Sequence, residues 1–204
     1  MHERVADGTL AAGANVTEAR LVEEFGVSRP TARSAIARAV TLGLLAQEPN
    51  KAALVPIVTG AAVRDMFRVW IPLELEAIRM LSAHEVLLDP AARCAASRLA
   101  DLGAAPLHVF SEEDLRFHRE LMTSTGSERL RYHWSLLEKE LQLAMLQARR
   151  ETQADQVSAE HLAIVAAIEN GDSERAHRLA LDHLTDSREE IAFRVSVGAW
   201  RVPR

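Results

Sequence analysis

Four side chains of this sequence have the chemistry to hold a metal ion. Asp114 and His118 are four residues apart, and two further candidates, His161 and His183, follow later in the chain. Residues i and i+4 of an α-helix project from one face, one turn apart, so this carboxylate and this imidazole can bind one ion together. The same spacing also occurs in solvated pairs and in surface hydrogen bonds. The first pair alone leaves both interpretations open.

The two later histidines favour the metal interpretation. A helical pattern over residues 157–168 ends at a turn around Gly171, and a second helical pattern follows over 173–191. His161 lies ten residues before the turn glycine and His183 twelve residues after it, about 15 Å and about 18 Å along their helices. In an antiparallel hairpin the two imidazoles therefore lie at nearly one height. All four side chains can then converge inside a helical bundle.

Such a ligand set leaves one or two coordination positions open on a typical transition metal. We therefore expect one divalent transition metal, with zinc preferred over nickel or manganese, and a small organic acid or water in the open positions. Two other interpretations remain. The cluster could serve a hydrolase or dioxygenase that activates water or oxygen, although no general base is evident beside it, or the ion could be purely structural.

The elements that must position this site are helices. Residues 59–204 show six helical patterns, which predict an all-helical bundle. Pro56 to Gly60 forms a short linker before them, too short to allow free tumbling of what precedes it. The predicted helices cover residues 61–83, 90–102, 111–122, 128–150, 157–168 and 173–191.

Composition limits the class of protein. The chain has 204 residues, with 48% hydrophobic and 26% charged residues, which is ordinary for a soluble globular protein of one large or two small domains. The single Cys94 excludes an internal disulfide and fits a reducing cytoplasm. We see no secretory signal and no apolar run that could span a membrane, so we expect a cytoplasmic protein. The net charge is −5, but residues 1–60 contain equal numbers of basic and acidic side chains.

A helical hairpin is predicted near the N-terminus. Residues 17–25 form a short helix with Thr17 as its N-cap, and Ser28 caps a second helix that follows Gly26. We expect both helices to bury one apolar face. The residues expected to face the core are Leu21, Val22 and Phe25 in the first helix and Ala32, Ala35, Ile36, Ala39 and Val40 in the second.

The opposite face of the second helix is basic. Arg29, Arg33 and Arg38 project from it, with Thr31 beside them. Arginine suits both bidentate contact with guanine and ion pairing with phosphate, so this helix could enter a major groove as the second helix of a helix-turn-helix. The alternative is a solvated face on an ordinary helical hairpin.

The sequence resembles a known family at these positions. Residues 25–36, followed by Gly43-Leu44-Leu45 and preceded by the turn at 7–13, resemble the winged helix-turn-helix of GntR-type bacterial transcription regulators. Residues 65–204 resemble the FCD effector domain of the FadR-like branch, with Asp114, His118, His161 and His183 at its metal-ligand positions. The resemblance implies a mainly α-helical protein with a winged helix-turn-helix over 1–58 and an FCD-type bundle over 59–204.

The same resemblance implies which residues meet DNA. Arg29, Thr31 and Arg33 would contact the operator, with Ser28 at a phosphate. A wing over residues 44–55 would place Asn50 and Lys51 at its tip. These six residues are the predicted DNA-binding site.

This chain departs from the family pattern at several positions. Asn50 replaces the usual wing-tip glycine, and asparagine is the non-glycine residue that best tolerates a positive φ. Ser34 replaces a glutamate of the family. Trp70 stands where relatives often have an arginine, and this second change bears on the identity of the effector. Only Met1 to Ala6 precede the first turn, so the first helix is expected to be short or truncated.

These observations together predict a metal-dependent, ligand-responsive transcription regulator that is not an enzyme. We expect a homodimeric repressor whose two recognition helices enter successive major grooves of a near-palindromic operator. A small organic acid at the metal would shift the domain orientation and thereby the affinity for DNA. The alternative is a metal-dependent hydrolase or dioxygenase.

Overall fold

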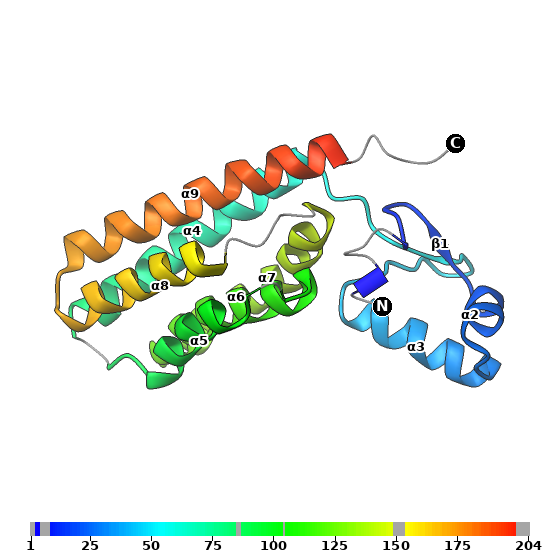
Figure 1. Ribbon diagram of the computed structural model, residues 1–204, viewed down its shortest axis with the longest axis horizontal. Coiled ribbons are helices and arrows are strands. Elements are labelled where there is room, and N and C mark those ends of the chain that lie inside the picture. The colour runs from blue at the N-terminus through cyan, green and yellow to red at the C-terminus, as the bar shows by residue number, and fades with distance from the viewer. Residues whose placement is uncertain (1–2, 5–8, 85–86, 104, 149–153, 199–204) are drawn as a thin grey trace.

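The computed structural model describes residues 3–4, 9–84, 87–103, 105–148 and 154–198. A long helical bundle lies at one end of the molecule, and a smaller N-terminal part with a two-stranded sheet lies at the other (Figure 1). The predicted fold class, mainly α-helical with a winged helix-turn-helix before a bundle, is confirmed. Within the described residues, no helix is both long and apolar enough to cross a membrane.

From residue 9 onward, the described N-terminal part is built on two helices and one strand pair. Thr17 accepts a hydrogen bond from the Arg20 N–H at 3.2 Å, and Ser28 accepts one from the Thr31 N–H at 3.3 Å, so both predicted N-caps form. The strands pair antiparallel, with Val16 opposite Ala53. The elements are β1 (Asn15–Val16), α2 (Glu18–Phe25), α3 (Arg29–Thr41) and β2 (Ala53–Leu54).

Two residues expected in this core lie outside it. Phe25 is 55% exposed, and Ala35 is also exposed. Phe25 occupies the last position of α2, directly before Gly26, which ends the helix with a φ of +62°. The guanidinium of Arg4 lies over that ring, 5.0 Å from its centroid. In α3 only Ala32, Ile36 and Ala39 are buried, because the facing elements cover a narrower stripe than the apolar pattern offers.

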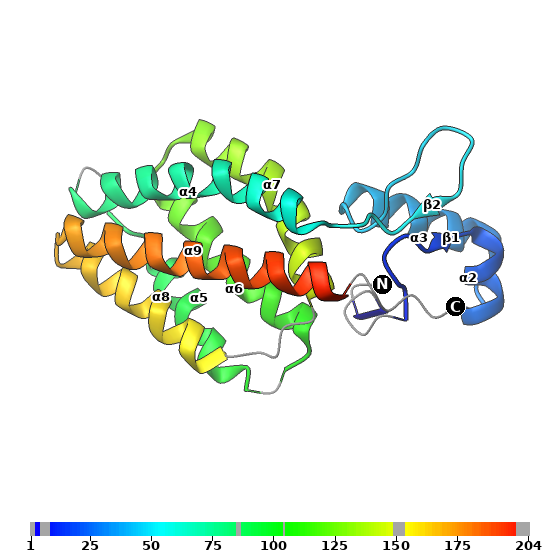
Figure 2. The same cartoon turned by 90° about the horizontal axis from the view of Figure 1, so that it is seen from above.

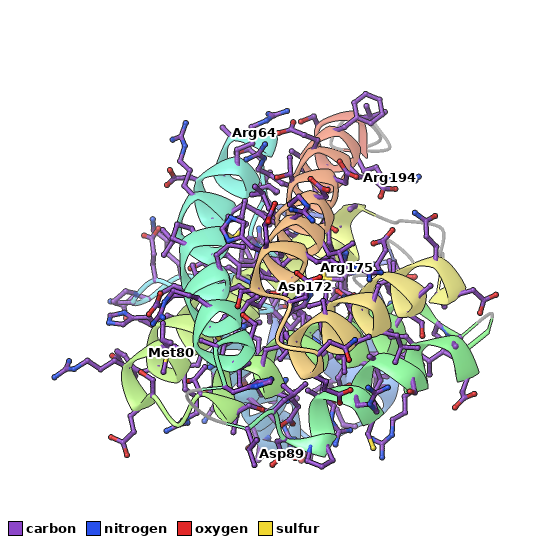
Figure 3. The ribbon with its side chains drawn as sticks, turned by 90° about the vertical axis from the view of Figure 1, so that its left-hand side faces the viewer. Arg64, Met80, Asp89, Asp172, Arg175 and Arg194 are labelled. Carbon is purple, nitrogen blue, oxygen red and sulfur yellow. The ribbon has the colours of Figure 1, made fainter. Side chains whose placement is uncertain are left out.

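Six helices form the bundle in the part of the chain that the structure describes, as predicted. α4 and α9 run side by side along its length, and Figure 3 looks along the helices from the end that carries Asp89 and Asp172. A Cβ on Gly60, the first residue of α4, would lie 2.7 Å from the Ala192 carbonyl oxygen of α9, so glycine permits this close approach. The helices are α4 (Gly60–Ser82), α5 (Pro90–Asp101), α6 (Leu107–Ser124), α7 (Glu128–Ala148), α8 (Ala154–Glu169) and α9 (Ser173–Gly198).

The helix that carries Asp114 and His118 begins earlier than expected. The sequence predicts a helix over residues 111–122, with Ser111 as its N-cap, whereas α6 begins at Leu107 after Pro106. Ser111 is instead buried inside the helix, and its hydroxyl donates to the His108 carbonyl oxygen at 3.1 Å. The additional turn is stabilised by burial of apolar side chains, including Phe110, which a capping pattern alone does not reveal.

Helix α7 contributes to both parts of the molecule. Trp134 and Ala144 belong to the core of the bundle. Leu143 and Leu146 belong to the core of the N-terminal part, which includes Leu44. Accordingly, the C-terminal end of α7 lies where the bundle faces the N-terminal part (Figure 1).

Candidate metal centre and DNA-binding surface

Three histidines from three helices meet inside the bundle. His118 of α6, His161 of α8 and His183 of α9 are buried, and each offers a ring nitrogen within 4.8 Å of the other two. The Nε2 atoms of His161 and His183 are 3.1 Å apart. The structure thus brings together three of the four predicted ligands.

Asp114 borders this group. It lies one turn before His118 on α6 and is 7% exposed. Its Oδ1 atom is 3.7 Å from His161 Nε2, although the carboxylate is not part of the three-histidine group. The fourth predicted ligand is therefore adjacent to the cluster.

A buried carboxylate fixes the orientation of His118. Glu74 of α4 is fully buried, and its two carboxylate oxygens lie 2.8 and 2.9 Å from His118 Nδ1. The Trp70 indole N–H also donates to this carboxylate, at 2.6 Å. A proton on Nδ1 would then leave the lone pair on His118 Nε2, a buried atom that has no hydrogen-bond partner among the described residues.

His183 has a similar support. Its Nδ1 atom is 2.7 Å from the Glu160 carboxylate, whose side chain is 38% exposed. The sequence interpretation missed both glutamates. Glu74 could have been found, because it falls among Phe67, Trp70 and Ile78 on the buried face of α4, where a carboxylate needs a partner.

Burial and charge act differently on two of the histidines. Burial, followed by the charges of His183 and His118, holds the pKa of His161 well below its usual range, so this ring is neutral at pH 7. Burial also lowers the pKa of His118, but the charge and hydrogen bond of Glu74 and the charge of Asp114 raise it overall. A neutral imidazole and nearby carboxylates favour a cation at this place.

Aromatic rings limit the movement of these imidazoles. Phe117 stacks on His161 with centroids 3.9 Å apart, and Trp70 meets His118 edge to face at 4.8 Å. The donor set of three imidazoles and a nearby carboxylate is one that divalent transition metals accept. Together with the orphaned nitrogen of His118, this packing fits a metal ion.

Four of the six predicted DNA-contacting residues lie at the exposed N-terminal end of α3. Arg29, Thr31 and Arg33 are exposed in its first turns, while the Ser28 hydroxyl caps the helix. Arg33 is paired with the first residue of α2: its Nε–H donates to Glu18 Oε1 at 2.6 Å, and its Nη2–H donates to Oε2 at 3.2 Å. The guanidinium is held in place, yet the side chain remains 73% exposed.

The predicted wing follows α3. Figure 2 shows the loop before β2 standing out from the N-terminal part. Asn50 has a φ of +62°, as expected for a residue in place of the wing-tip glycine. Lys51 has a 68% exposed side chain and is ion-paired with Glu48 of the same loop.

Comparisons with known proteins agree with this architecture. Residues 1–55 match the family described as bacterial regulatory proteins, gntR family, and residues 65–186 match the FCD domain. No curated protein matches the chain.

Several solved structures share the fold. A putative transcriptional regulator GntR from Rhodococcus sp. RHA1 has a TM-score of 0.74 and 21% identity, covering 98% of this chain and 95% of its own. Lar of Listeria monocytogenes, which is described as controlling the agr system and mediating virulence, has a TM-score of 0.65 and 16% identity, covering 99% and 94%. E. coli McbR/YncC has a TM-score of 0.61 and 17% identity, covering 93% and 92%.

At these identities the solved structures establish the shared fold alone. The FCD match, however, covers more than half of the chain, and the gntR match covers the segment that carries α2, α3 and both strands. The chain therefore belongs to the GntR family of bacterial transcription regulators, in the FadR-like branch that carries an FCD domain.

Proposed function

We propose that this regulator is a metal-dependent repressor whose operator affinity changes when a small organic acid binds in the bundle. The observation that carries this proposal is the convergence of three buried imidazoles, with Glu74 and Glu160 on the far nitrogens of His118 and His183. Such carboxylates orient histidines toward a shared ion.

In this proposal, residues 1–58 bind DNA and residues 59–204 sense the ligand. Arg29, Thr31 and Arg33 contact base edges and phosphates, Ser28 meets a phosphate, and Asn50 and Lys51 contact DNA through the wing. Two subunits place their α3 helices in successive major grooves of a near-palindromic operator. Its action on bacterial chromosomal DNA would place the protein in the cytoplasm.

Asp114, His118, His161 and His183 would hold one divalent ion, with zinc preferred over nickel or manganese. When bound, the ion would supply a Lewis acid with open positions for a carboxylate. No lysine or arginine is buried among the described residues, so no basic side chain competes for that carboxylate in the core. The protein's own share is to keep His161 neutral and to orient His118 and His183 through Glu74 and Glu160.

The alternative function is a metal-dependent hydrolase or dioxygenase. Such an enzyme needs a free general base beside its metal. Both glutamates nearest the cluster are hydrogen-bonded to histidine Nδ1 atoms, so neither is free for that role. This arrangement favours binding without turnover.

The test uses the full chain and a double substitution, His161→Ala with His183→Ala. We expect the wild type to bind one equivalent of Zn²⁺ in isothermal titration, and metal removal with a chelator to change its affinity for an operator selected from random duplexes. The double variant should remain folded by circular dichroism but lose both properties. His177→Ala, an exposed histidine of α9, is the control.

Three results would contradict this proposal. A wild type without stoichiometric metal would remove the sensing role, and an unfolded double variant would indicate a purely structural ion. Chemical conversion of candidate organic acids by the metal-loaded protein would establish the enzyme alternative.

A further inference from the structure

The last turns of α7 are built into the DNA-binding part of the molecule. Leu143 is 3% exposed and Leu146 is fully buried, and both belong to the core that includes Ile36 of α3 and Leu44. These two leucines lie about a hundred residues from their partners in the chain. The recognition helix therefore shares its core with a helix of the bundle.

One amide side chain also holds the linker between the two parts. Gln147 Nε2–H donates to the Pro56 carbonyl oxygen at 2.6 Å, and the Val58 N–H donates to Gln147 Oε1 at 3.0 Å. The amide thus satisfies one acceptor and one donor of the backbone, two residues apart. Neither a carboxylate nor an apolar side chain of similar size can make both bonds.

A third contact reaches the end of the recognition helix. Lys139 Nζ donates to the carbonyl oxygen of Thr41, the last residue of α3, at 2.6 Å. Such carbonyls lack an intrahelical partner and attract cations. Gly43 lies at the same contact with a φ of +73°, and a Cβ there would come within 3.1 Å of Lys139 Cβ. Glycine therefore permits α7 to approach this closely.

From these contacts we infer that Gln147 and Lys139 are positioning residues for operator recognition. They fix the angle between α3 and the bundle, so that the two subunits of a dimer present their recognition helices at one spacing. This role rests on the two-subunit binding proposed above. A rigid angle raises the effective concentration of the second helix at its half-site, whereas a loose linker lowers it.

The same helix touches the support of the metal centre. Trp134 of α7 packs against Trp70, with ring centroids 5.9 Å apart, and the Trp70 indole N–H is bonded to the carboxylate that holds His118. A shift of α7 would therefore change the packing around Trp70 and the packing of the N-terminal core. In the proposed regulator, α7 would therefore offer one direct route by which ligand binding reaches α3.

The test compares full and single half-sites. The probe is the duplex that the wild type selects from a random pool, together with versions cut to one half-site or altered by one base pair in the spacer. For Gln147→Ala we expect the full-site affinity to fall about tenfold, because two hydrogen bonds that fix the domain angle are lost. The single half-site should be bound with unchanged affinity, and the spacing preference should broaden.

Two further variants sharpen the result. Lys139→Met should show the same pattern with a smaller loss, because its contact is exposed to water. Gln142→Ala, the same residue type on the same helix, is the control and should behave as the wild type.

Different outcomes would contradict the positioning role and the proposed two-subunit binding. If Gln147→Ala retains the narrow spacing preference of the wild type, the positioning role is wrong. The role is also wrong if half-site affinity falls in equal measure, since that indicates general damage to the DNA-binding part. If the wild type itself binds a half-site as tightly as the full site, the two-subunit proposal fails and takes this inference with it.

Discussion

The proposed recognition surface and the proposed metal centre each pair a nitrogen-bearing side chain with a carboxylate, but in opposite surroundings. Arg33 and Glu18 form an exposed pair on the surface of the N-terminal part, while His118 and Glu74 form a fully buried pair in the bundle. Exposed ion pairs contribute little and are screened by salt. Separating a buried pair leaves an uncompensated charge in a medium of low dielectric constant.

This difference fits the two tasks. In the proposed DNA contact, Arg33 would exchange Glu18 for a phosphate or a guanine at a low free-energy cost, because the pair is exposed. Glu74 cannot leave His118 at a similar cost, so that pair keeps one ring orientation. The surface pair is suited to exchange and the buried pair to fixed geometry.

The largest expected effect tests whether burial matters at the metal centre. Glu74→Gln removes the negative charge and replaces one of the two oxygens beside His118 Nδ1 with an amide donor, so we expect the Zn²⁺ affinity to fall by about 10- to 100-fold in isothermal titration. Glu160→Gln is the matched variant, and its loss should be smaller because water can reach that half-exposed side chain. Equal losses would show that burial does not distinguish the two supports.

The next effect tests the exposed pair as a DNA contact. Arg33→Ala should weaken binding to the selected operator by about tenfold or more in fluorescence anisotropy, because a base or phosphate contact is lost. The thermal midpoint should change little. Arg38→Ala, in the last turn of α3, should have a smaller effect on binding. A similar loss from both arginines would favour a diffuse charge effect over specific contact.

The smallest effect concerns Glu18 itself. Its hydrogen bond to Arg33 lowers its pKa; desolvation opposes this effect, and the charges of Arg33 and Arg29 add to it. The stability from this pair is therefore complete above the unfolded-state pKa of Glu18 and is lost as pH falls through the lower folded-state pKa. In Glu18→Gln, the free energy of unfolding should therefore fall slightly less steeply as the pH is lowered through this range. An unchanged pH dependence of unfolding would mean that the pair contributes nothing measurable to stability.

Local spacing predicted those features that depend on one helix or one turn. The N-caps at Thr17 and Ser28 and the positive φ of Asn50 follow from residue type and neighbours within a few positions. The approach of His161 to His183 follows almost as directly, because a single turn connects their helices.

Features that depend on which element covers which face were missed. Glu74 is 44 residues from His118, so no local pattern links them. The exposure of Phe25 and Ala35 depends on how far neighbouring elements extend over α2 and α3, which an apolar stripe does not specify. The insertion of α7 into the N-terminal core likewise needs the tertiary arrangement.

The membership of α7 in two cores restricts how its length can change during evolution. One inserted residue between Trp134 and Leu143 would rotate everything beyond it by about 100° and advance it by about 1.5 Å. Leu143, Leu146 and Gln147 would then face away from their partners, even though each side chain is unchanged. Surface loops can gain or lose residues freely, but this segment must keep its helical register for the bundle and the N-terminal part to stay packed together.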